Sequence, residues 1–156
     1  MTFFRVGRRC NRPMGLQTGA IKNSMVTASS QWNNYHAAFL GRLHWGRRGR
    51  YMGAWSAKHN NRYQYLQVDF GRAAKIIRIA TQGRQDADQW VTQYYVMHSL
   101  DLLRFSEYKE RNNRRVSEEL WGELALIFFT KPGSPFMRII SPFIIIRTVL
   151  DEGSIF

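Results

Sequence analysis

The sequence predicts an all-β domain, and three observations carry that prediction. Short apolar runs rich in β-branched and aromatic residues recur along the chain, with turn-forming residues between them. Hydrophobic residues make up 44% of the chain and aromatic residues 14%, as in a packed globule. The length of 156 residues suits one domain with its own core. Together these features favour a β-sandwich or a barrel.

The predicted strands are Tyr65–Phe70, Lys75–Ala80, Trp90–Met97, Met137–Ile140 and Phe143–Val149. The first alternates apolar and polar residues and ends at Gly71, and the last two lie on either side of Pro142. Asp69 is expected to make a structural hydrogen bond at a strand end. The residues assigned to the core are Trp55, Leu66, Val68 and Trp90.

One segment has a helical pattern. In Val116–Phe129, Ser117 is followed by two glutamates, as at a helix start, and Leu120, Leu124 and Ile127 share one face. We therefore expect a helix there, or a poorly packed edge within residues 111–127.

The charge is segregated along the chain. The net charge is +12, yet no Asp or Glu occurs before Asp69, and residues 1–68 carry eleven Lys or Arg. A field of one sign attracts anions such as sulfated glycans, anionic lipid headgroups or nucleic acid. The alternative is that the charge serves solubility alone.

The sequence lacks several kinds of segment and site. Cys10 is the only cysteine, which excludes an internal disulfide and a CxxC-type zinc site. Residues 1–15 contain four arginines but lack the apolar core of a secretory signal. No apolar run reaches the roughly 18 residues of a membrane-spanning helix.

The sequence gives no support for an enzyme. It lacks the HExxH, Walker A, GxSxG and EF-hand patterns, so no cofactor or metal is expected. The glycine-rich stretch Gly46–Gly53 is interpreted as a turn, and Asp86 with Asp88 as a solvated polar turn, in preference to a carboxylate pair or a calcium site. The four histidines lie apart in sequence, with no neighbouring nucleophile: they are His36, His44, His59 and His98.

Several segments, taken in order, resemble the discoidin family, the coagulation factor 5/8 type C domains. They are Cys10–Gly15, Thr27–Trp32, Ala37–Leu43, Gly53–Trp55, Tyr65–Gly71, Thr81–Arg84, Trp90–Tyr94 and Ser99–Tyr108. Leu102 departs from the pattern, because the family has glycine there. Beyond Arg111 the likeness weakens, although Arg138–Pro142 and Arg147 still resemble the family's ending. The expected domain spans residues 10–154, after a basic extension of residues 1–9.

The resemblance implies a jellyroll-like antiparallel β-sandwich of about eight strands, with binding loops projecting from one end. Family loops of this kind bind phosphatidylserine membranes, glycans, collagen or receptors. In the family, the position of Cys10 forms a disulfide with a terminal cysteine. Ser154 stands near the partner's place here, so we predict that Cys10 is a free thiol.

The loops that correspond to the family's binding loops are Gln31–His36, His44–Met52 and Arg84–Gln89. Amphipathic aromatic rings beside guanidinium groups suit a contact surface. Alternatively, Trp32 packs inward and the arginines are merely solvated. The candidate binding residues are Trp32, Asn33, Asn34, Tyr35, His36, Trp45, Arg47, Arg48, Arg50, Arg84 and Gln85.

The function expected from these features is non-catalytic binding at a cell surface or in the extracellular matrix, within a longer or misassembled chain. The expected partner is a glycan, an anionic membrane or an extracellular protein. The alternative is an intracellular nucleic-acid-binding domain that uses the same arginines and aromatic rings for phosphates and stacking.

Overall fold

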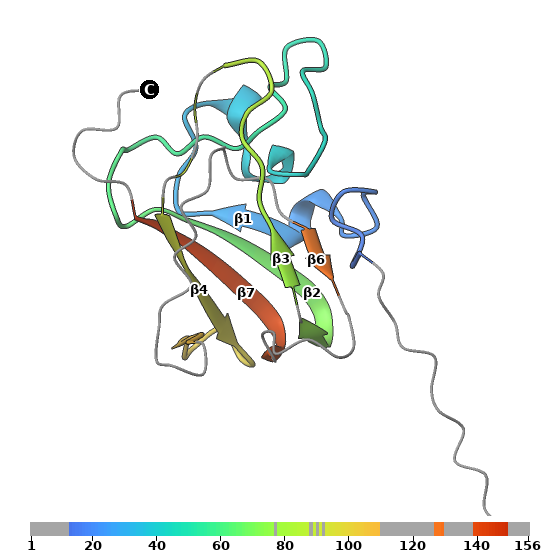
Figure 1. The fold of residues 1–156 in the computed structure, drawn as a ribbon, viewed down its shortest axis with the longest axis vertical. Helices are drawn as coiled ribbons and strands as arrows, with labels where there is room; N and C mark the ends of the chain where they lie inside the picture. The colour runs from blue at the N-terminus through green and yellow to red at the C-terminus, as the bar shows by residue number, and fades with distance from the viewer. Residues whose placement is uncertain are drawn as a thin grey trace, which may run out of the picture.

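The computed structural model describes residues 13–76, 78–87, 89, 91, 93–109, 127–129 and 139–149. Within these residues the chain forms two antiparallel sheets, and the all-β prediction is confirmed (Figure 1). The helical elements that the structure describes are three short 3-10 turns, η1 (Asn23–Met25), η2 (Asn34–His36) and η3 (Ala38–Leu40).

The larger sheet has five strands in the order β1-β2-β7-β4-β5. Their bounds are β1 Val26–Ala28, β2 Tyr65–Ile76, β7 Ile139–Val149, β4 Gln93–Ser99 and β5 Ser106–Glu107. The smaller sheet pairs β3 (Arg78–Ala80) with β6 (Ile127–Phe129). In Figure 1 this pair crosses one face of the five-stranded sheet.

The two predicted runs around Pro142 are one strand, which corrects the sequence-based boundaries. Pro142 has no backbone N–H, so it cannot donate a hydrogen bond to a neighbouring strand. A central strand tolerates proline only at a position where no such donor is needed. Ser141 pairs with Ala74 and Phe143 pairs with Asp69, so Pro142 lies opposite the bulge of β2. On its other side, β4 has already ended, because Phe143 pairs with the last β4 residue, Ser99. Proline is therefore tolerated in β7.

The bulge itself follows from Asp69 and Gly71. Gly71 has a φ of +68°, which a residue with a side chain rarely adopts. Its backbone N–H donates to Asp69 Oδ1 at 2.6 Å, which confirms the structural hydrogen bond predicted for Asp69. The predicted end of the strand at Gly71 was wrong, because β2 continues to Ile76.

Three other predicted elements change their bounds. The predicted strand Lys75–Ala80 is divided between the end of β2 and β3, which belong to different sheets. The predicted strand Trp90–Met97 corresponds to β4, Gln93–Ser99. The predicted helix was wrong over its last three residues, because Ile127–Phe129 pairs with β3 as a strand.

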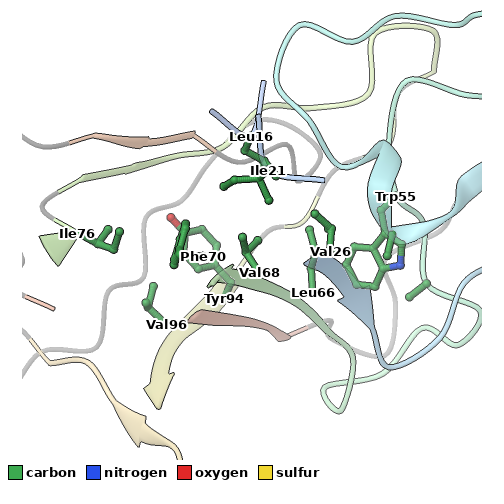
Figure 2. Packing of buried hydrophobic residues seen from close by; sticks show 12 residues of the cluster. Leu16, Ile21, Val26, Trp55, Leu66, Val68, Phe70, Ile76, Tyr94 and Val96 are labelled. Carbon is green, nitrogen blue, oxygen red and sulfur yellow. The ribbon is translucent and has the colours of Figure 1, made fainter. Parts of the chain in front are cut away.

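The core lies between the larger sheet and the elements that cover it. Figure 2 shows Leu66, Val68 and Phe70 from β2 beside Tyr94 and Val96 from β4. All five are buried, as the alternation of the sequence predicts for one face of a strand. Completing this core are Leu16, Ile21, Val26, Ala38, Trp55, Ala57 and Ile76. The core assignments of Trp55, Leu66 and Val68 are confirmed.

Some predictions fall outside the described residues. They concern Cys10, Asp88, Trp90, Ser154 and the part of the expected helix that precedes Ile127. The free thiol of Cys10 therefore stays a prediction, as do the domain bounds at residues 10 and 154.

Candidate functional site

The predicted binding loops gather at one end of the larger sheet. β1 ends there at Ala28, which pairs with Leu66 near the start of β2. The segment before β4 reaches the same end, because Gln93 pairs with Val149 and Tyr65 pairs with Arg147. Figure 1 shows the loops between β1 and β2 and the loop after β3 together above this end.

Hydrogen bonds hold the first loop rigidly over the core. Ser29 Oγ and Ser30 Oγ donate to the buried Gln64 Oε1 at 2.9 and 2.5 Å. The indole N–H of Trp55 donates to the carbonyl oxygen of Ser30 at 2.8 Å. The backbone N–H of Trp32 donates to the carbonyl oxygen of Ser56, also at 2.8 Å. A binding residue on this loop is thus preorganised.

A hollow of about 320 Å³ opens between the first and third loops. Its volume lies at the small end of the range of ligand pockets, roughly 300–1,000 Å³. Trp32 forms one wall with 62% of its surface exposed, so the alternative that this ring packs inward was wrong. The lining consists of Trp32, His36, Ser56, Ala57, Arg84 and Gln89.

His36, which lines this hollow, keeps one hydrogen-bond acceptor without a partner among the described residues. Its Nδ1 lies 2.9 Å from Asn33 Oδ1, which also accepts from the backbone N–H of Tyr35. An amide oxygen only accepts, so the imidazole proton sits on Nδ1, and Nε2 keeps its lone pair. No described residue donates a hydrogen bond to Nε2. Burial lowers the pKa of His36, the charge of Arg84 adds to this, and Asp86 partly opposes it.

Arg84 supplies donors to the same hollow. Its Nε and Nη2 donate to the two carboxylate oxygens of Asp86, at 2.5 and 3.3 Å, and its Nη1 donates to Gln89 Oε1 at 2.7 Å. A guanidinium has five N–H groups, so two remain that donate to no described residue. The hydrogen bond from Arg84 also lowers the pKa of Asp86.

The second loop is a tight turn fastened to both of the others. Arg48 and Tyr51 exchange backbone hydrogen bonds of 2.9 and 3.1 Å, and the Met52 N–H donates to the carbonyl oxygen of Tyr35 at 2.9 Å. At Gly46, an added Cβ would lie 2.9 Å from Gln85 Oε1, so the turn also contacts the third loop. The interpretation of the glycine-rich stretch as a turn is confirmed.

Aromatic rings and guanidinium groups pair along this second loop. Arg50 lies 5.8 Å from the ring centre of Tyr35, and Arg48 lies 4.8 Å from that of Trp45. Such cation–π contacts orient the side chains at little cost. Trp45 is half-buried, and its indole N–H donates to the carbonyl oxygen of Gln17 at 2.9 Å.

The structure brings three of the predicted binding residues together in the hollow, Trp32, His36 and Arg84. Asn33 orients His36, whereas the side chain of Asn34 accepts a hydrogen bond from Gln31. Sequence reasoning missed Ser56, Ala57 and Gln89 as lining residues. The sequence could have indicated them only through their positions. Ser56 and Ala57 directly follow Trp55, and Gln89 ends the third loop.

The described part of the chain lacks both a metal-binding cluster and a membrane-spanning helix. No three His, Cys, Asp or Glu side chains there are grouped to hold a metal ion. No helix among those residues has the length and apolarity needed to cross a membrane.

Loops at one end of a rigid β-sandwich are where the ligand-binding residues of such small domains commonly lie, and the fold alone does not fix a function. Residues 25–130 match the F5/8 type C domain, and the chain belongs to this family. It is 36% identical over 110 residues to bovine (Bos taurus) coagulation factor V and 35% identical over 113 residues to lactadherin of Rattus norvegicus. These matches cover 67% and 69% of this chain, but only 5% and 26% of those proteins.

Solved structures share the fold. The recombinant discoidin II of Dictyostelium discoideum is 22% identical with a TM-score of 0.63, over 80% of this chain and 49% of that one. A carbohydrate-binding module from Clostridium perfringens, solved with GalNAc-β-1,3-galactose, is 17% identical with a TM-score of 0.54, over 85% of this chain and 90% of that one. The prediction of a β-sandwich is confirmed by these likenesses.

Proposed function

We propose that this domain binds a glycan, and that it holds one sugar ring in the hollow between Trp32 and Arg84. The observation that carries the proposal is that the exposed indole of Trp32 lines the same hollow as His36 and Arg84, whose polar groups are already held in place. A sugar ring has an apolar face suited to an aromatic ring and a rim of hydroxyl groups that donate and accept hydrogen bonds.

Trp32, His36 and Arg84 would each make a different contact with the sugar. The indole of Trp32 would stack on the apolar face of the sugar and exclude water from it. His36 Nε2 would accept a hydrogen bond from one hydroxyl, and the two remaining N–H groups of Arg84 would donate to oxygens of the ring or its substituents. Asn33, Asp86 and Gln89 would hold these groups at fixed angles, so little entropy is lost on binding.

The sandwich domains of similar fold support the choice of a sugar. One was solved with GalNAc-β-1,3-galactose, and the family 32 carbohydrate-binding module of C. perfringens NanJ, with a TM-score of 0.50, was solved with galactose. We therefore take galactose as the probe. The proposal is binding without catalysis, in an extracellular setting.

The test is titration of the protein with galactose by isothermal calorimetry. Trp32→Ala is expected to weaken binding about tenfold or more, because burying a large apolar side chain is worth about 1.5–3 kcal/mol. Tyr63→Ala is the matched control, since Tyr63 is also 62% exposed but does not line the hollow. Binding of galactose that is equal in the parent and in Trp32→Ala would contradict the proposal.

A further inference from the structure

Three exposed arginines stand on the second loop without a carboxylate partner among the residues that the structure describes. None of Arg47, Arg48 and Arg50 forms an ion pair with a described residue. The chain contains no Asp or Glu at all before Asp69, so the first two loops carry positive charge alone. A guanidinium group favours bidentate contact with a sulfate or a carboxylate, so these three are available to an anionic ligand.

The turn that carries the arginines is rigid. Backbone hydrogen bonds between Arg48 and Tyr51 close it, and Gly49 takes the φ of +60° at its tip. Tyr51 packs edge-on against Tyr35 and Phe39, at ring-centre distances of 6.4 and 6.1 Å. The backbone that carries the positive charges is therefore held in place, which lowers the entropic cost of holding a ligand.

Neither Arg47 nor Arg50 is a lining residue, but both lie near residues that line the hollow or hold its lining. Arg50 lies over the ring of Tyr35, the residue next to His36 in the lining. Arg47 follows Gly46, where an added Cβ would lie 2.9 Å from Gln85 Oε1, next to Arg84 of the lining. The hydrogen bond from Arg84 lowers the pKa of Asp86, and the charge of Arg47 adds to this. The carboxylate of Asp86 is matched by the guanidinium of Arg84, so the excess charge at the rim is positive. Arg48 instead stacks on Trp45.

We infer that the ligand of the hollow is an acidic glycan, whose sulfate or carboxylate group is held at the rim by Arg47 and Arg50. This inference rests on the proposed function and names the class of sugar. A membrane surface fits less well, because Tyr35 and Tyr51 are engaged with each other and Trp32 lines a concave site. The neutral part of the sugar would lie against Trp32 and the anion beside the second loop.

The experiment compares three sugars by calorimetry at low and high salt: galactose, galactose 6-sulfate and galacturonic acid. At low salt, at least one of the two acidic sugars is expected to bind the parent about tenfold or more tighter than galactose, as charge-assisted hydrogen bonds imply. This ratio should shrink at high salt, because exposed charges are screened. A preference for just one acidic sugar identifies the anion and supports the inference.

Two variants locate the effect. In Arg47→Ala/Arg50→Ala the ratio of the dissociation constants of galactose and of the preferred acidic sugar should fall to about one, since both contacts to the anion are lost. Arg104→Ala is the control for the loss of an exposed arginine elsewhere on the domain. Arg104 follows β4, whereas the third loop precedes it, so the length of the strand, roughly 20 Å, separates Arg104 from the hollow. The ratio should be unchanged in this control.

The outcomes separate the inference from the function on which it rests. Equal affinity of the parent for all three sugars would overturn the inference and leave glycan binding intact. Failure of the parent to bind any of the three would overturn both. A further arm uses vesicles of phosphatidylserine and phosphatidylcholine in equal parts. Vesicle binding that is lost in the double variant but not competed by galactose 6-sulfate would also overturn the inference, in favour of a membrane surface.

Discussion

The guanidinium group of Arg42 donates from Nη2 to the carbonyl oxygen of Ile21 at 3.0 Å, inside the core. The same side chain donates to the carbonyl oxygens of Phe39 and Leu16 and to Asn23 Oδ1. Burial lowers the pKa of Arg42. With no carboxylate partner among the described residues, its charge is balanced by carbonyl dipoles. Arg42 thus ties the segment before β1 to the turn η3.

Loss of Arg42 is therefore expected to destabilise the domain severely. Arg42→Ala leaves several buried acceptors without a donor and should lower the free energy of unfolding by about 3 kcal/mol or more. Urea unfolding followed by tryptophan fluorescence measures this change. The exposed Arg72 is the control, and its replacement by alanine should change stability by less than about 0.5 kcal/mol. A loss below about 1 kcal/mol for Arg42→Ala would contradict the tying role.

Replacement of Trp55 and of Trp32 by alanine should have different effects on stability and on sugar binding. Trp55 is buried in the core and donates to Ser30, so Trp55→Ala should cost about 3–5 kcal/mol of stability. Trp32 is exposed, so Trp32→Ala should change the unfolding midpoint little while it weakens sugar binding. Thermal unfolding together with galactose titration distinguishes the two. A large loss of stability in Trp32→Ala would assign that ring to the core instead.

Acidification should weaken both the fold and the site through His36. Its pKa in the folded state is lowered mainly by burial, from the ordinary value of 6.5. Below about that pH the unfolded chain binds more protons than the folded one, so stability is lost as the pH falls. His98, whose pKa burial also lowers, acts in the same direction. A protonated His36 would also lose the acceptor at Nε2, so galactose affinity should fall over the same range.

The measurement is urea unfolding and galactose titration at about pH 7.5 and about pH 5. His36→Gln should remove part of the pH dependence of stability, and the remainder reports His98. If galactose affinity is equal at the two pH values, His36 Nε2 does not accept a hydrogen bond from the sugar.

The sequence was informative where structure follows from local pattern. The burial of Leu66 and Val68 follows from alternation along one strand. The continuity of β7 through Pro142 does not, because it depends on a bulge in β2. The hollow likewise combines residues from the first loop, the third loop and the segment after Trp55, and its lining by Ser56 and Gln89 depends on how the strands bring those segments together. Contacts of this kind are set by topology, which single-sequence patterns do not encode.

One departure from the family pattern stores strain. Leu102, where the family has glycine, adopts a φ of +64°, a left-handed conformation that costs a residue with a Cβ about 1–2 kcal/mol. The surrounding turn holds it there. Ser99 Oγ accepts from the backbone N–H of Leu102 at 2.9 Å, and Asp101 Oδ1 accepts from those of Leu103 and Arg104 at 2.9 and 3.1 Å.

Leu102→Gly should therefore leave the domain as stable as the parent or more stable, by up to about 1 kcal/mol. Glycine relieves the left-handed strain, and little apolar burial is lost because Leu102 is 44% exposed. Against this stands the larger entropy of glycine in the unfolded chain. Leu103→Gly is the matched control: Leu103 is 85% exposed and has no positive φ, so glycine there brings only the entropic cost, about 0.5–1 kcal/mol. Urea unfolding of the two variants beside the parent measures the difference. A Leu102→Gly variant less stable than Leu103→Gly would mean that Leu102 makes contacts worth more than its backbone strain.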